Sequence, residues 1–138
     1  MPELTVRDLA TSLRFWRDLL GFQVVYSRES FAFLERAGAQ FMLEERNTSS
    51  WITGTLEPPH GRGIHFEIAV GSIEPLLSAL RDARHPLWQA TEERWYRVGD
   101  DEIGQRQFLV QDPEATCSAS PSRSAHAPRA EGEARSAQ

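Results

Sequence analysis

The chain has 138 residues, a formal net charge of −5, 40% hydrophobic residues and one cysteine. This length supports one domain with its own core. The negative charge argues against nucleic acid as a partner, and the single Cys117 excludes a disulfide framework or a cysteine-cluster metal site. No apolar run is long enough to cross a bilayer and no signal peptide is recognisable, so we expect a cytoplasmic protein without a membrane partner.

Residues 1–46 have the pattern of a strand, a helix and three further strands. Asp8 is suited to cap a helix whose apolar residues recur at helical spacing as far as Leu20, and Gly21 is placed to end it. Alternating apolar residues predict the strands. The expected strands are Glu3–Val6, Phe22–Arg28, Phe31–Glu35 and Gln40–Arg46.

Residues 47–62 are rich in Ser, Thr, Gly and Pro and are interpreted as a linker. In residues 63–113, Ser72 is the expected cap of a second helix, which tolerates Pro75 in its first turn. Asp112-Pro113 is an expected turn. The strands expected in this part are Ile64–Val70, Leu87–Ala90, Arg94–Val98 and Gln105–Gln111.

The two parts repeat one pattern. Leu4 corresponds to Ile68 and Leu13 to Leu77, each 64 positions later. A repeat of this length indicates two half-domains of the same architecture that face each other. The space between two such halves is a natural ligand site.

The opening motif resembles that of the vicinal oxygen chelate superfamily, which includes glyoxalase I, extradiol dioxygenases, fosfomycin resistance enzymes and bleomycin resistance proteins. The resemblance covers residues 1–113 as one domain, with module one at 1–46 and module two at 63–113. It implies an α+β fold of paired βαβββ modules that form a cupped mixed sheet. The motifs are Leu4-x-Val6-x-Asp8-Leu9-x-x-Ser12-Leu13-x-Phe15-Trp16-x-x-x-Leu20-Gly21-Phe22 and Phe108-x-x-x-Asp112-Pro113.

The resemblance also bears on metal binding. Metal enzymes of the family carry a His on the first strand and a Glu on the last strand of each module. His65 fits the second His position, but Met1 and Met42 stand at the two positions of module one. One ligand of four cannot hold a catalytic divalent ion, so we expect no metal and no cofactor. A shifted register that uses Glu44 is the alternative.

Aromatic and acidic residues are the stronger candidates for a binding site. Large aromatic rings that are flanked by polar residues are expected to contact a ligand or another subunit. A flat cation would stack on such rings, and nearby carboxylates would bind its charge. Glu3 and Glu67 are expected to be solvated or to lie at the rim of the cavity, where they could contact a cationic ligand, whereas His60 and His85 are expected on the surface. The candidate ligand-binding residues are Phe31, Phe33, Trp51, His65, Trp88, Glu92, Glu93, Trp95, Tyr96, Asp100 and Asp101. For Phe31, Phe33 and Trp88 a role in the core is the alternative, and for His65 a hydrogen-bonded role in a buried strand.

Residues 114–138 depart from the family. Members usually continue with Gly-Tyr-x-Leu as the eighth strand, whereas this tail is rich in Ala, Ser, Arg and Pro. We expect it to be disordered, with the last strand of module two missing. Deletion of one nucleotide after the codon of Glu114 would convert a Gly-Tyr-Leu-Leu-Arg-Leu ending into this tail, which makes a frameshift a hypothesis.

These observations favour a bleomycin-resistance-type binding protein over an enzyme. Such a protein would sequester a small aromatic, cationic ligand, such as a bleomycin-like antibiotic, without chemistry, and would act as a homodimer. A metal-dependent glyoxalase- or dioxygenase-like enzyme is the alternative, and an inactive truncated family member is a further one.

Overall fold

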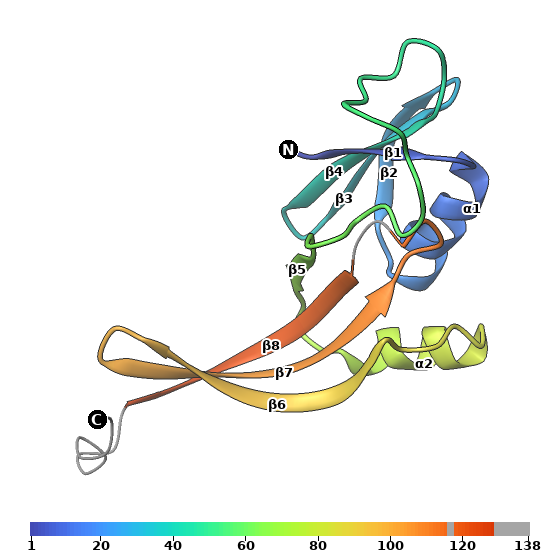
Figure 1. Ribbon diagram of the computed structural model, residues 1–138. Coiled ribbons are helices and arrows are strands. Elements are labelled where there is room, and N and C mark those ends of the chain that lie inside the picture. Colours follow the sequence, from blue (N-terminus) through green and yellow to red (C-terminus); the bar gives the residue numbers. More distant parts are fainter. Residues whose placement is uncertain (116–117, 129–138) are drawn as a thin grey trace.

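The computed structural model describes residues 1–115 and 118–128, and in residues 118–128 it describes the backbone alone. Two four-stranded mixed sheets are each accompanied by helical segments (Figure 1). The elements of the first unit are β1 (Glu3–Val6), α1 (Leu9–Leu13), η1 (Arg14–Leu19), β2 (Gln23–Arg28), β3 (Phe31–Arg36) and β4 (Ala39–Glu45). Those of the second are β5 (Phe66–Ala69), α2 (Glu74–Asp82), β6 (Gln89–Val98), β7 (Asp101–Gln111) and β8 (Ser118–Pro128).

The two sheets have the same topology. The first sheet has the strand order β1-β4-β3-β2 and the second has β5-β8-β7-β6, so each strand of one sheet has a counterpart in the other. In both sheets the first and last strands of the unit pair in parallel, and the remaining pairs are antiparallel. The expected fold class of paired βαβββ modules is therefore confirmed.

The first helical segment begins at the expected cap. The Asp8 carboxylate accepts a hydrogen bond from the backbone N–H of Thr11 at 2.7 Å, as an N-cap does. After Leu13 the segment widens into the π-helix η1, which the sequence pattern did not predict. The wider turn allows two consecutive residues, Phe15 and Trp16, to be buried together.

One continuous core joins the two units. Trp16 is fully buried at its centre, with its ring centroid 4.5 Å from that of Phe41 and 5.5 Å from that of Phe22. Phe108 of β7 and Leu80 of α2 belong to the same cluster of buried residues. Each of these large side chains contributes roughly 1.5–3 kcal/mol when it is fully buried. No helix in the described part of the chain is long and apolar enough to span a membrane.

The expectation that the last strand of module two is missing is wrong. β8 lies between β5, to which it is parallel, and β7, to which it is antiparallel. Pairing of this kind uses only backbone N–H and C=O groups, so a segment of small and polar residues can provide it and cover two edges that would otherwise be unpaired. Residues 118–128 of the tail form this strand, while residues 116–117 and 129–138 lie outside the described part, so the expected disorder of the tail stays a prediction.

Candidate functional site

A pocket of about 640 Å³ lies on the face of the second sheet that is turned away from α2. Its floor is formed by alternate side chains of β6 and β7 together with Glu67 of β5, and its wall by residues 59–65, where the linker ends and the second unit begins. The opposite face of β7 carries Phe108 and Val110, which are buried in the core with Leu76 and Leu80 of α2. The period of two along a strand thus separates a core face from a pocket face.

A β-bulge shapes the floor. The sequence predicts two short strands, Leu87–Ala90 and Arg94–Val98, but the structure joins them in β6 with a register shift between Gln89 and Glu92. The extra residue lets both Gln89 and Glu92 line the pocket although they are three positions apart. A bulge re-aims side chains in this way without ending the strand.

Amide and carboxylate groups are paired along the floor. Gln107 Nε2 donates to Glu92 Oε1 at 2.9 Å, and Gln105 Nε2 donates to Glu67 Oε1 at 3.1 Å. The hydrogen bond from Gln107 is the largest of the causes that lower the pKa of Glu92, and Arg94 adds to it. Glu92 therefore stays ionised at neutral pH.

Two aromatic rings form the apolar part of the pocket. Trp88 is 64% exposed and Tyr96 is 40% exposed. The Tyr96 hydroxyl accepts a hydrogen bond from Gln107 Nε2 at 3.0 Å, which ties this ring to the floor. Rings of this size that remain in contact with water provide surfaces on which a flat ligand can stack.

The wall at residues 59–65 is held from both sides. Arg62 donates to the backbone carbonyl oxygens of Pro59 and Glu57 at 3.0 and 3.1 Å. The backbone N–H of Gly61 donates to the carbonyl oxygen of Ala115 at 3.0 Å. The linker is thereby joined to the chain segment that follows β7.

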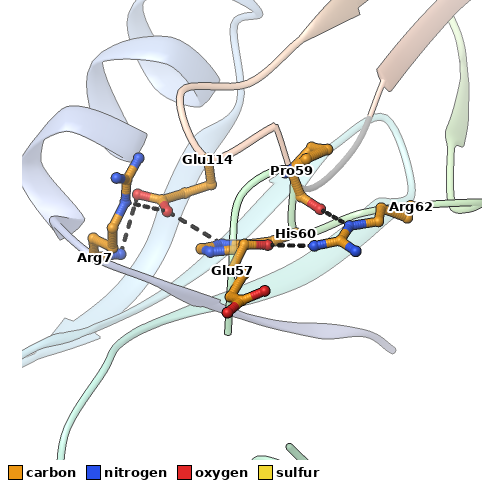
Figure 2. Close-up of polar contacts among 6 residues, drawn as sticks. All are labelled: Arg7, Glu57, Pro59, His60, Arg62 and Glu114. Atoms are coloured by element: carbon orange, nitrogen blue, oxygen red, sulfur yellow. Dashed lines mark hydrogen bonds and ion pairs between the residues drawn. The ribbon is translucent and has the colours of Figure 1, made fainter. Parts of the chain in front are cut away.

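A buried carboxylate connects this wall to the first unit (Figure 2). Glu114 is only 3% exposed, and it accepts hydrogen bonds from the backbone N–H of Arg7 at 3.1 Å and from Arg7 Nε at 2.9 Å. His60 Nδ1 lies 3.4 Å from the same carboxylate. The expectation that His60 is a surface residue is wrong, because its side chain is only 8% exposed and faces Glu114. We call Arg7, His60 and Glu114 the inter-module clasp.

The structure brings four of the eleven candidate ligand-binding residues together in the pocket: His65, Trp88, Glu92 and Tyr96. His65 is exposed on the pocket lining, so its alternative role as a buried core residue is wrong. Trp88 is likewise exposed rather than in the core.

The other seven candidates lie elsewhere. Glu93 and Trp95 alternate with the pocket residues of β6, and the ring of Trp95 packs on Gly104 of β7. Asp100 is in the turn between β6 and β7, Asp101 is the first residue of β7, and Trp51 is 96% exposed in the linker. Phe31 and Phe33 are on the first sheet, where Phe31 is buried, Phe33 is half-buried, and both rings contact Tyr26.

Several pocket residues were not among the sequence-based candidates. They include Glu67, considered only as a rim carboxylate, the arginines Arg62 and Arg94, and the amides Gln89, Gln105, Gln107 and Gln111. The alternation of Gln105, Gln107 and Gln111 along one strand is the signal that could have identified them. A glutamine on a strand usually faces solvent, so this alternation by itself does not indicate that the three side chains form the floor of a pocket.

Metal ligands are not gathered anywhere among the described side chains. No group of three or more His, Cys, Asp or Glu residues there could hold a metal ion. Met42 pairs with Glu3 of β1 and with Phe33 of β3, and Glu44 pairs with Phe31. These positions belong to the first sheet, whereas His65 lines the pocket on the second.

The family model of the Glyoxalase/Bleomycin resistance protein/Dioxygenase superfamily matches residues 2–118. The chain belongs to this superfamily. No curated protein matches the chain significantly.

Several solved structures align with most of the chain. A virulence protein from Salmonella typhimurium is 19% identical, covers 87% of this chain and 92% of its own, and superposes with a TM-score of 0.62. Lactoylglutathione lyase from Agrobacterium tumefaciens is 17% identical over 88% and 90%, with a TM-score of 0.57. A superfamily member from Vibrio splendidus is 31% identical over 89% and 95%, with a TM-score of 0.40. At these identities the first two show a shared fold.

Proposed function

We propose that this superfamily member binds a small aromatic, cationic ligand and sequesters it without chemistry, as bleomycin resistance proteins do. The observation that carries the proposal is the pocket on the second sheet, which combines the exposed rings of Trp88 and Tyr96 with the carboxylates of Glu67 and Glu92. Its volume of about 640 Å³ lies within the ordinary range for sites that take a small organic molecule.

The physical basis is the complementarity between this lining and a flat cation. Cations are attracted to the faces of Trp and Tyr rings, and the attraction increases as water is excluded. The floor adds carboxylates whose orientation is set by amide hydrogen bonds, so a bound cation does not have to order them. A planar, positively charged antibiotic of the bleomycin type has these properties. We assign the protein to the cytoplasm, where it would protect the cell by holding such a drug.

A homodimer completes the proposal. Phe31 and Phe33 lie on the first sheet, away from the pocket on the second. A two-fold arrangement would bring the first sheet of one copy to the pocket of the other, so that one ligand could touch the half-buried ring of Phe33 as well as the pocket, while the buried Phe31 supports that ring from within the sheet. Sedimentation at micromolar concentration should find a dimer, and a monomer that binds the ligand equally well would contradict this part of the proposal.

The experiment is a fluorescence titration with a metal-free bleomycin. The double variant Trp51→Phe, Trp95→Phe leaves Trp16, which is fully buried, and Trp88, which lines the pocket. We expect saturable quenching in this variant and its loss when Trp88→Phe is added. Absence of quenching at drug concentrations up to the millimolar range, or quenching that persists without Trp88, would refute drug binding in this pocket.

A further inference from the structure

β6 is the outer strand of the second sheet, and one of its two edges is free (Figure 1). Among the described elements, β7 alone lies alongside it. Residues 93–98 are all exposed, and the β-bulge of this strand lies before them, between Gln89 and Glu92. Proteins usually protect such an edge with lysine, proline, a bulge or a very short strand. Residues 93–98 have none of these features, so this edge is open to another strand.

The turn that follows β6 shows which backbone groups face the free edge. Val98 and Asp101 are cross-strand partners on either side of the two-residue turn Gly99-Asp100, and Gly99 has the positive φ of 65° that a type II′ turn requires at its first position. The residues that flank such a turn form a hydrogen-bonded pair, and bonded and non-bonded pairs alternate along antiparallel strands. The residues of β6 whose backbone N–H and C=O groups point to the free edge near its end are therefore Glu93, Trp95 and Arg97.

The charges of these three residues complement themselves about Trp95. If two copies pair antiparallel with Trp95 opposite Trp95, Glu93 of each copy lies opposite Arg97 of the other. Both charges are available for such a contact. Glu93 makes no ion pair among the described side chains, and Arg97 Nε donates to the carbonyl oxygen of Gly99 at 3.2 Å. A register with Glu93, Arg94 or Arg97 on the two-fold axis would oppose like charges, which is unfavourable.

The side chain of Trp95 leaves the free edge accessible. Its ring lies over Gly104 of β7, so closely that a Cβ atom on this glycine would come within 2.8 Å of the ring. Gly104 is the cross-strand partner of Trp95, so the ring is directed toward β7 and away from the free edge. The largest side chain of this stretch therefore does not block a second strand at the two-fold position.

We infer that β6 pairs edge to edge with β6 of a second copy, antiparallel and with Trp95 at the two-fold axis. The second sheets of the two copies then form one continuous sheet. Arg94 and Tyr96 line the pocket, and this register places Arg94 of each copy beside Tyr96 of the other. The two pockets therefore open side by side on one face. This contact goes beyond the proposed function and uses none of the first sheet, so it is separate from the two-fold arrangement described above.

Exchange of the two charges tests the register. In Glu93→Arg both contacts between the copies join two arginines, and in Arg97→Glu both join two glutamates. Each variant alone should therefore self-associate at least about tenfold more weakly than the parent. An equimolar mixture of the two variants should associate like the parent, because each contact then joins one arginine to one glutamate. Sedimentation equilibrium from micromolar to millimolar concentration measures all of these affinities.

The matched control is Asp82→Arg, which reverses an exposed charge at the end of α2, in the same unit but away from the free edge. It should associate like the parent. The inference is overturned if the parent does not self-associate, if either β6 variant associates like the parent, if the control loses as much, or if the mixture stays as weak as its components. A dimer that is unchanged in both β6 variants would use another surface and would leave the dimer of the proposed function standing.

Disulfide cross-linking tests the two-fold position independently. Hydrogen-bonded residues of antiparallel strands have Cα atoms about 5.5 Å apart, which a disulfide can span. Trp95→Cys, in a Cys117→Ser background, should therefore give a covalent dimer under mild oxidation. In Thr91→Cys the two cysteines would be eight positions apart along the paired strands, roughly 27 Å, and should not cross-link. No covalent dimer of Trp95→Cys, or an equal yield from Thr91→Cys, would contradict the inferred pairing.

Discussion

Replacement of Glu114 by Gln should destabilise the protein through loss of the inter-module clasp. The carboxylate is almost fully buried and accepts two hydrogen bonds from Arg7, one from its backbone N–H and one from Nε. An amide has one accepting oxygen, so its NH₂ group must face a donor, and one of these bonds is lost. Breaking a fully buried ion pair costs about 3–5 kcal/mol.

The cost here should be smaller because Arg7 is 60% exposed and its guanidinium can turn to water. The variant loses one charge-assisted hydrogen bond and places an NH₂ donor opposite another donor. Together these changes should lower the free energy of unfolding by about 1–3 kcal/mol. For a domain of this size that corresponds to a decrease in Tm of about 4–12 °C. Urea unfolding and thermal melts followed by circular dichroism measure both quantities.

The control for this prediction is Asp18→Asn. Asp18 also pairs with an arginine, Arg17 at 2.7 Å, but both side chains are 49% exposed. Exposed pairs contribute little, so this variant should melt with the parent. An unchanged Tm for Glu114→Gln, or an equal decrease in Tm for both variants, would refute the argument that the inter-module clasp stabilises the protein because Glu114 is buried. A double-mutant cycle with Arg7→Gln should be non-additive, because the two residues share the bonds.

Three further predictions concern pH, metal content and β8. Hydrogen bonds from Thr11 lower the pKa of Asp8 from its ordinary 3.8. The stabilisation that the Asp8 charge provides is therefore fully present above that value and disappears as the pH falls through the lowered folded-state pKa. The difference in Tm between the parent and Asp8→Asn should decrease as the pH falls below 3.8, and a difference that stays constant would contradict this. Elemental analysis of the purified protein should find no stoichiometric metal, whereas one tightly bound ion per chain, lost in His65→Ala, would overturn the expectation. Amides of residues 118–128 should be protected from hydrogen exchange because β8 pairs with β5 and β7, and exchange at the rate of an unstructured peptide would contradict the strand.

The first unit was the more predictable half because its signals are local. A cap such as Asp8, a glycine such as Gly21 and alternating apolar residues each act over a few positions, and β1 was predicted with its observed bounds. The π-helix could not be predicted, because it depends on fitting Phe15 and Trp16 into one core that both units build. β8 was missed for a related reason, since its place is defined by the open edges of β5 and β7 and its own residues carry little strand signal.

The candidate site was predictable in part. Trp88, Tyr96 and Glu92 stood out as aromatic and acidic residues, and they do meet in one pocket. The bulge between Gln89 and Glu92 sets which residues of β6 face that pocket, and the ordinary alternation along the strand places Tyr96 on the pocket face and its neighbour Trp95 on the other. Phe31 and Phe33 belong to β3 of the first sheet and therefore lie away from the pocket. Their aromatic character alone did not show on which sheet they would lie.

The measurement that tests the account most directly is calorimetric titration of metal-free bleomycin into the parent protein and into Trp88→Ala, followed by mass spectrometry of the recovered drug. We expect saturable binding with a negative heat-capacity change, as apolar burial requires, weaker binding without Trp88, and recovery of the drug unaltered. No detectable binding to the parent protein, or recovery of a chemically modified drug, would contradict a protein that sequesters its ligand without chemistry.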